Sequence, residues 1–438
     1  MTTEPKSTEA AHPKVSPWTF ALGEMGLGLV GNLVGTYALF FYTDKMGLPV
    51  ALTALAATIN AIWDGVDDPL FGYLSDRNRA RRGRRFWLFF SFPLYVIATT
   101  LIWTPPANLE QNALFAYYLV FLLLFETAAT ISWVNYRSLF PSHFPEEHQR
   151  TNASAIRKAL GAVAMIVSIS LAPLIYGRFG FAAMGAVFSV SAAILLGLFL
   201  WRIRENRNAT DAPAQETPNI FAAFAHAFRN RAFVIYALVY GFIIFAQLVL
   251  VSGIPFYTKY SLDMDEGATS MLLAAILVVG IPGVLLWTWL QRRIGSKASW
   301  LASSLMMAAG LVPFGLAANF TVVMIGGVVV GLGLAGFNVI SEVIIADIID
   351  GDAKKDGLRR EGVFYSIPSI LARLSGVFAA QSLALLTPLF GYVNGENPGS
   401  NPAAAFRFFM TVLPIAMLLL AAVLTWFYPQ ERKTVEGA

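Results

Sequence analysis

The stretch that decides the fold is residues 60–76, which read Asn-Ala-Ile-Trp-Asp-Gly-Val-Asp-Asp-Pro-Leu-Phe-Gly-Tyr-Leu-Ser-Asp. Asp64, Asp67 and Asp68 lie inside a segment that is otherwise apolar for long enough to cross a bilayer, roughly one helical turn apart. An ionised carboxylate near the bilayer centre costs about 3 kcal/mol on insertion scales. Clusters of this kind usually face an internal cavity and handle ions, so these three acids are the first candidate site.

An arginine-rich turn is expected directly after the acids. Its basic residues are Arg77, Arg79, Arg81, Arg82, Arg84 and Arg85. Short loops that are rich in Lys and Arg stay on the cytoplasmic side of a membrane. This turn therefore predicts the orientation of the neighbouring spans.

The composition indicates a polytopic membrane protein. Of 438 residues, 56% are hydrophobic and 13% are charged, whereas soluble domains are about one-quarter charged. The net charge of +4 would suit a nucleic-acid partner, but the basic residues lie in short loops between apolar segments, so no nucleic acid is expected. The absence of Cys excludes disulfides and thiolate metal sites. No nucleophile–base set or phosphate loop is recognisable, so we expect neither an enzyme nor a cofactor.

Apolar windows of about 20 residues predict an all-α membrane protein with twelve transmembrane helices. The expected spans are residues 18–43, 49–75, 86–103, 113–139, 152–176, 179–202, 232–258, 267–290, 297–316, 320–348, 362–388 and 404–428. With this assignment, 23 Lys and Arg fall on the side of the arginine-rich turn and 4 on the opposite side. This bias predicts that both termini are cytoplasmic.

The twelve spans form two sets of six, which is the pattern of major facilitator transporters. The expected parts are a cytoplasmic N-terminal tail (1–17), a first six-helix bundle (18–202), a central cytoplasmic loop (203–230), a second six-helix bundle (231–428) and a cytoplasmic C-terminal tail (429–438). In this architecture the substrate lies near the membrane midplane, between the halves. We expect a multi-pass monomer in the cytoplasmic membrane, with a small-molecule substrate and membrane lipid as its partners.

Further polar residues lie within or near the expected spans. In helix 1 a glycine-rich face either packs closely on a neighbour or makes room for a ligand beside Glu24 and Asn32. Glu126 and Arg373 lie well inside apolar spans, which favours a functional role for both. Glu342 and Asp347 remain open to a plain surface role if helix 10 ends early.

The motifs resemble the glycoside-pentoside-hexuronide cation symporters, a major facilitator family, in their melibiose/sodium symporter type. The resemblance covers nearly the whole chain. It rests on Trp63-Asp-Gly-Val-Asp-Asp-Pro69, on Phe41-Tyr-Thr-Asp44, on Ala346-Asp-Ile-Ile-Asp350 and on Tyr365-Ser366.

The resemblance implies a cation site. Asp64 and Asp68 match the family's two cation-binding carboxylates, Thr130 matches its hydroxyl ligand, and Asp67 stands where the type has Asn. Such oxygen ligands suit a hard cation, so the coupling ion is expected to be Na⁺ or H⁺. The added acid favours a proton or a second cation, because neighbouring carboxylates do not all ionise cheaply. The alternative is that Asp67 pairs with a cytoplasmic Arg.

The substrate side departs from the family's type. The two sugar-binding acids of the type fall at Gly28 and Trp133 here, whereas the basic positions Arg157 and Arg373 remain. A more positive pocket suggests a substrate that carries a carboxylate, sulfonate or phosphate. Glu24 and Glu126 argue against an anionic substrate, since either can neutralise one of these arginines. The expected substrate-binding residues are Glu24, Asn32, Glu126, Trp133, Arg157 and Arg373.

The resemblance thus implies a cation-coupled secondary symporter that imports a glycoside, a sugar acid or another sugar derivative by alternating access. We expect a cytoplasmic gate of ion pairs formed by Arg77, Arg82, Arg85, Asp347 and Asp350. Three alternatives stay open. The run from Leu124 to Thr127 resembles vertebrate lysolipid symporters, which suggests a lysolipid or other amphiphile. A proton-antiport exporter and a transporter-like sensor are the others.

Overall fold

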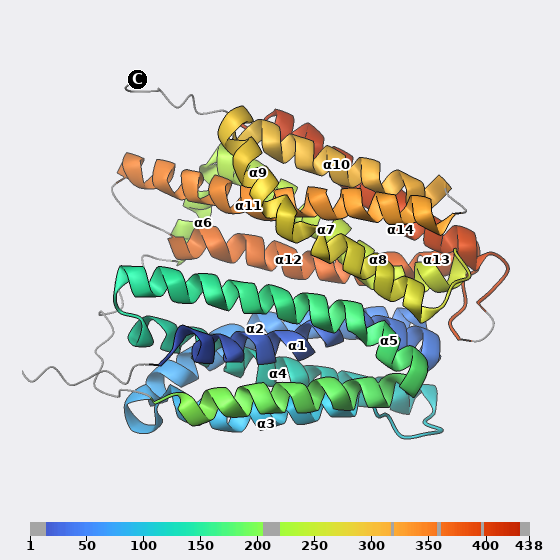
Figure 1. The fold of residues 1–438 in the computed structure, drawn as a ribbon, viewed down its shortest axis with the longest axis horizontal. Helices are drawn as coiled ribbons and strands as arrows, with labels where there is room; N and C mark the ends of the chain where they lie inside the picture. The colour runs from blue at the N-terminus through green and yellow to red at the C-terminus, as the bar shows by residue number, and fades with distance from the viewer. Residues whose placement is uncertain (1–14, 205–219, 317–318, 357–360, 396–397, 430–438) are drawn as a thin grey trace, which may run out of the picture.

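A computed structural model describes residues 15–204, 220–316, 319–356, 361–395 and 398–429 (Figure 1). All regular structure in these ranges is helical. The first half contains α1 (Pro17–Phe40), the one-turn π-helix η1 (Phe41–Lys45), α2 (Val50–Arg82), α3 (Arg84–Ile102), α4 (Gln111–His143) and α5 (Glu147–Arg202). The second half follows the short helix α6 (Ile220–Arg229). It contains α7 (Arg231–Tyr260), α8 (Glu266–Val278), α9 (Gly280–Ile294), α10 (Ser296–Leu316), α11 (Phe320–Asp356), α12 (Glu361–Ala384), α13 (Leu386–Phe390) and α14 (Pro402–Trp426).

Ten helical stretches in the described ranges are long and apolar enough to cross a membrane. One of them is α5, which has 56 residues and is broken at Gly180 by a positive φ of 83°. A straight helix of that length would be about 84 Å long, roughly twice a bilayer. Figure 1 shows α5 turning back on itself as two antiparallel lengths. These lengths coincide with the expected spans 152–176 and 179–202, while the full count of twelve stays a prediction.

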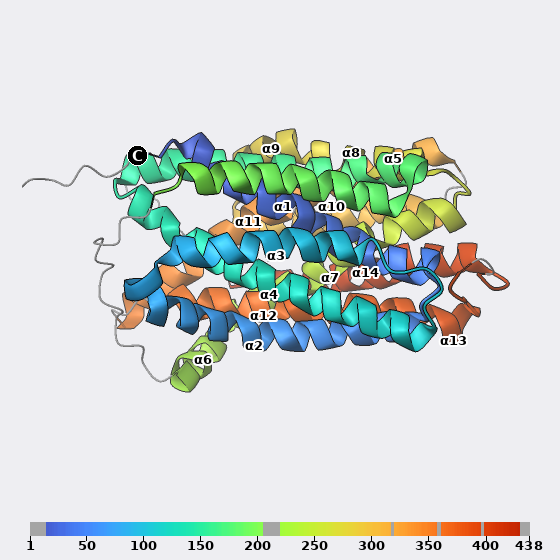
Figure 2. The same ribbon diagram turned by 90° about the horizontal axis from the view of Figure 1, so that it is seen from below.

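The structure differs from the sequence-based expectations in three places. The arginine-rich stretch is not a turn, because α2 continues to Arg82 and Gly83 then breaks the chain with φ 73°. Arginine is a good helix former, so nothing stops the helix before that glycine. Asp350 lies inside a helix, because α11 continues past residue 348 to Asp356. The expected central loop contains α6, an apolar helix that lies beside the main bundle (Figure 2).

Small residues let the helices approach closely. A Cβ on Gly26 would lie 2.8 Å from the Leu196 side chain, and one on Gly310 would lie 2.8 Å from the Gly326 carbonyl oxygen. In a membrane, helix association depends on such close packing rather than on a hydrophobic driving force between helices. The glycines of α1 are not all of this kind, since a Cβ on Gly35 would meet no atom within 4 Å.

The two halves are joined at the end of the bundle that carries η1 and α13, which we call the latch end (right in Figure 1). Asp44 in η1 has no exposed side-chain surface, and its Oδ2 accepts a 2.6 Å bond from Lys259 Nζ of α7. The Tyr260 hydroxyl donates to the other oxygen of Asp44. We call Asp44, Lys259 and Tyr260 the latch. A charge buried across an interface in this way is costly to leave without its partner.

Further contacts between the halves surround the latch. The Ser270 hydroxyl donates to the Ser170 carbonyl, and the Asn394 amide donates to the Gly47 carbonyl. The Phe40 and Phe256 rings meet edge to face at 4.9 Å. The structure is therefore closed at the latch end.

Replacing Lys259 by Met should loosen this closure, because it removes the cation that compensates Asp44. The chain has no Cys, so a Ser170→Cys, Ser270→Cys pair can report on the distance between the halves. We expect a short thiol-to-thiol reagent to cross-link this pair at least severalfold more slowly when Lys259→Met is added. Lys45→Met, which removes an exposed neighbouring charge, is the matched control and should leave the rate unchanged. Equal rates in both backgrounds would rule out a latching role.

Candidate functional site

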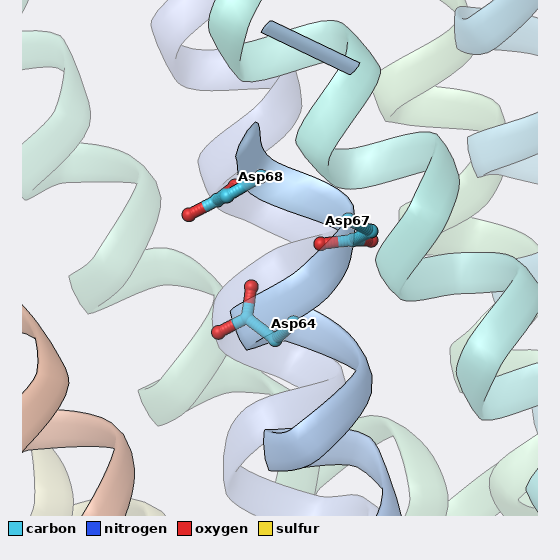
Figure 3. Close-up of side chains that lie close together, drawn as sticks. All are labelled: Asp64, Asp67 and Asp68. Atoms are coloured by element: carbon cyan, nitrogen blue, oxygen red, sulfur yellow. The ribbon is translucent and has the colours of Figure 1, made fainter. Parts of the chain in front are cut away.

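The three acids of α2 form one compact cluster. Asp64, Asp67 and Asp68 each place a carboxylate oxygen within 4.8 Å of the others. Asp64 and Asp68 extend from one side of the helix, whereas Asp67 points to another side (Figure 3). Pro69 follows directly and has no N–H for the Gly65 carbonyl, which leaves an additional backbone oxygen beside the acids. A Cβ on Gly65 would meet nothing within 4 Å, so the cluster borders open space.

Asp67 is the most deeply buried of the three, with no exposed surface. Its Oδ1 accepts a 3.3 Å hydrogen bond from the Thr130 hydroxyl of α4. Its Oδ2 is buried and has no hydrogen-bond partner. A buried acceptor without a partner costs about 1–3 kcal/mol. The donor set therefore fits a bound proton or a small hard cation, which would satisfy this oxygen.

Asp64 and Asp68 have a partner in the other half of the molecule. Arg373 of α12 binds Asp64 through Nε and Asp68 through Nη2. The Arg373 side chain is 28% exposed, and those of Asp64 and Asp68 are 16% and 40% exposed, so these ion pairs are partly shielded from solvent. Helix α2 packs against both α4 and α12 (Figure 2), which brings Arg373 to acids more than 300 positions earlier in the chain. Two of the four predicted cation ligands, Asp64 and Asp68, are thus paired with an internal cation in this structure.

Two further contacts hold α2 against α4 near the acids. The Asn60 amide lies 3.5 Å from Glu126 Oε2, and the Trp63 indole donates to the Thr127 hydroxyl at 2.8 Å. Glu126 and Thr130 are one turn apart on α4, so both face this region of α2. Glu126 therefore borders the carboxylate cluster.

A second polar cluster lies between α1 and α5. Arg157 Nε is 3.4 Å from Glu24 Oε2, and the Arg157 guanidinium lies 4.5 Å from the centre of the Phe140 ring. A Cβ on Gly161 would be 3.3 Å from the Glu24 side chain, so this glycine makes room for the acid. Glu24 neutralises Arg157 here, as the objection raised from the sequence anticipated.

The remaining predicted substrate residues, Asn32 and Trp133, lie on α1 and α4. Asn32 is half-buried two turns beyond Glu24 on α1. Trp133 is half-buried on α4, with the Arg137 guanidinium 5.0 Å from its ring centre. The predicted substrate residues thus fall into two groups. Glu126 and Arg373 adjoin the carboxylates, and Glu24 and Arg157 form a pair of their own.

The predicted gate is described only in part. Arg77 donates to the Tyr73 hydroxyl at 3.4 Å, and Arg85 donates to the Leu200 carbonyl at 3.0 Å, both within the first half. Asp347 and Asp350 are exposed on α11. The side chain of Arg82 lies outside the described residues, so its pairing with Asp350 stays a prediction.

Sequence reasoning missed two contacts. The first is the ion pair of Asp44 and Lys259. Asp44 was expected at the end of a span and Lys259 in a loop, so their opposite charges were the one signal of pairing. His226 of α6 lies 2.9 Å from the buried Asp352 of α11. His226 belongs to residues 203–230, which were expected to form the central loop. A lone apolar run with one His at residues 220–229 was the available signal.

Comparisons with known proteins agree over nearly the whole chain. The profile described as MFS/sugar transport protein matches residues 19–432. The chain is 24% identical to an isoprimeverose transporter of Lactiplantibacillus pentosus, with 98% of this chain and 92% of that protein aligned. It is 22% identical to a putative sulfoquinovose importer of Salmonella typhimurium (93% and 88% aligned). It is 24% identical to the sodium-dependent lysophosphatidylcholine symporter 1 of Mus musculus (94% and 85% aligned).

The fold also has solved counterparts. One is a bacterial homologue of the human lysosomal transporter Spinster, solved in an inward-facing and unoccupied conformation. It superposes with a TM-score of 0.74 at 14% identity, and the match covers 96% of this chain and 97% of that one. At this identity the likeness concerns the fold alone.

Asp67 and Asp64 should respond oppositely to neutralisation. Asp67→Asn removes a buried charge and places an amide N–H beside two carboxylates, so we expect the melting temperature of the Na⁺-free protein to rise by a few degrees. Asp64→Asn removes one ion pair from Arg373, so the melting temperature should fall. Thermal unfolding in detergent measures both. If Asp67→Asn lowers the melting temperature as much as Asp64→Asn does, the Asp67 carboxylate has a stabilising partner besides Thr130.

Proposed function

Because the chain belongs to the MFS/sugar transport protein family, we propose that it is a cation-coupled symporter that imports a sugar or sugar derivative by alternating access. Membership confirms the family resemblance inferred from the motifs. The family and the structural neighbours are membrane transporters, so the chain is a multi-pass membrane protein rather than an enzyme. The substrate of this chain and the ion that drives its transport are the subject of the proposal.

The observation that carries the proposal is the carboxylate cluster of α2. Asp64, Asp67 and Asp68 come within 4.8 Å of one another inside an apolar bundle, and one buried oxygen of Asp67 is without a partner. Three acids in such surroundings need positive charge. We infer that the coupling ion, Na⁺ or H⁺, binds here with Thr130 as a further ligand.

The expected topology indicates which side of the membrane the latch end faces. We infer twelve spans by counting α2, despite its acids, and both lengths of α5. We place the protein in the cytoplasmic membrane with both termini in the cytoplasm. The latch end, at the far end of α1 from the N-terminus, then faces outward. The closed latch end then supports a state that is open toward the cytoplasm. Import would require the latch to open so that ion and substrate enter from outside.

The substrate would lie between the halves, in reach of Arg157 and Arg373. Both guanidinium groups are neutralised by acids of the protein in this structure, Arg157 by Glu24 and Arg373 by Asp64 and Asp68. A substrate with its own acidic group could replace those acids as a bidentate partner. Sulfoquinovose, named for one relative, carries a sulfonate on a sugar.

A lysolipid is the second candidate, because one relative is named as a lysophosphatidylcholine symporter. Its phosphate would use the same arginines. The two candidates differ in the group that is attached to the anion, which is a sugar ring in one and an acyl chain in the other.

Ion-driven uptake tests the proposal directly. In proteoliposomes with an inward Na⁺ or proton gradient, the wild-type protein should concentrate a radiolabelled sugar or sugar acid. The double substitution Asp64→Asn, Asp68→Asn should reduce uptake to the level of empty vesicles, because two of the three carboxylate ligands lose their charge. Asp263→Asn, which changes an exposed loop acid, should retain wild-type uptake. Concentrative uptake by the double variant would contradict the assigned ion site.

Competition tests the substrate class. We expect a sugar sulfonate or sugar carboxylate to compete for uptake at least about tenfold better than its neutral parent sugar, since a charge-assisted pair with arginine is worth about 1.5–3 kcal/mol. Arg157→Gln should reduce that preference while uptake of a neutral analogue persists. Stronger competition by the neutral sugar would eliminate the anionic class.

A further inference from the structure

We propose that Arg373 is an internal cation that the coupling ion displaces from Asp64 and Asp68, and that the freed guanidinium then binds the acidic group of the substrate. The inference rests on the proposed function and goes beyond it. It assigns the coupling between ion and substrate to the exchange of partners by one side chain.

The contacts make arginine and ion competitors for the same two residues. Arg373 uses two different nitrogens to bind Oδ2 of Asp64 and Oδ2 of Asp68. A cation held by the cluster would need oxygens from the same two residues, because the three acids offer their ligand atoms within a single 4.8 Å group. A guanidinium and a second cation at these carboxylates repel each other. Binding of the ion therefore weakens the hold of Asp64 and Asp68 on Arg373 and favours its release.

Arg373 satisfies only part of the cluster. Asp67 points to another side of α2 (Figure 3), and its Oδ2 keeps no partner while Arg373 is bound to the other two acids. A small ion placed among the three acids would contact all of them, whereas the arginine, fixed to α12, reaches two. The ion thus has an advantage that offsets the loss of the arginine contacts.

The displaced arginine needs a new partner. Its side chain is only 28% exposed, and a partly shielded guanidinium without an anion is costly. A neutral sugar cannot supply the missing charge, but a carboxylate, sulfonate or phosphate on the substrate can. Ion and anionic substrate then favour each other's binding, and this coupling is reciprocal.

The exchange also involves both halves of the molecule. Arg373 belongs to α12 in the second half, and the acids belong to α2 in the first. While the arginine is bound to them, it ties the halves together near the ion site. When Arg373 transfers to the substrate, the direct ion pair between the halves is replaced by a contact through the bound substrate.

The first test needs no substrate. Na⁺ affinity is measured from Na⁺-dependent thermal stabilisation of the purified full-length protein, and protonation of the cluster is measured by infrared absorption of its carboxyl groups in Na⁺-free buffer. Arg373→Gln should tighten Na⁺ binding at least about tenfold, or raise the pH of half-protonation by about one unit, because the competing cation is gone. Arg178→Gln removes an exposed guanidinium beside Phe179 and should change neither. Unchanged or weaker binding of both ions in Arg373→Gln overturns the proposal.

Arg373→Lys keeps the charge and guards against a folding defect in Arg373→Gln. It should bind the ion with an affinity between those of the wild type and Arg373→Gln. An affinity of Arg373→Lys equal to that of Arg373→Gln would show that the charge at this position does not compete, and would also overturn the proposal.

The second test addresses the partner exchange. In the wild-type protein, saturating sulfoquinovose or glucuronate should tighten ion binding severalfold, whereas glucose should not, and the effect should vanish in Arg373→Gln. If neither anion tightens ion binding, the transfer of Arg373 to the substrate is overturned. A loss of concentrative uptake with ion competition intact would instead count against the proposed symport alone.

Discussion

The structure depends on the need to balance three carboxylates inside an apolar helical bundle. Asp64 and Asp68 are balanced by Arg373 from the opposite half, and Asp67 has only a hydroxyl at 3.3 Å on one of its two oxygens. One guanidinium therefore faces three carboxylates, and one oxygen of Asp67 has no hydrogen-bond partner. A protein that only had to be stable would have apolar residues at these positions, since well-packed apolar groups are often as stable as a buried ion network.

The bundle positions these charges through close packing elsewhere. Glycines such as Gly26 and Gly310 allow helices within a half to approach closely, so each half behaves as a packed unit. In the described residues, the ion pairs between the halves include Arg373 with Asp64 and Asp68 at one level and Lys259 with Asp44 at another. Motion between two packed units requires that links of this kind be exchanged, as in a rigid-body cycle of alternating access.

The acids of α2 were predictable from sequence because three carboxylates in one apolar span have few explanations other than an internal polar site. The Thr130 contact with Asp67 confirms that α4 faces them. The partners of Arg373 were not predictable, because nothing in a linear pattern reveals which of several acids an arginine 305 positions away will meet. The end of α2 was misjudged because arginines were interpreted as loop residues, although arginine is compatible with a helix until a glycine breaks it. The break at Gly180, in contrast, lies within two residues of the expected gap between the spans 152–176 and 179–202.

The latch has a consequence for water. Asp44 is fully enclosed, and its oxygens are held by Lys259 and Tyr260 of the opposite half. When the halves part at this end, these groups must acquire hydration shells, and they must shed them again each time the end reseals. Every transport cycle therefore includes the hydration and dehydration of Asp44, Lys259 and Tyr260. Because osmotic stress makes hydration more costly, it changes the turnover rate separately from any ion gradient.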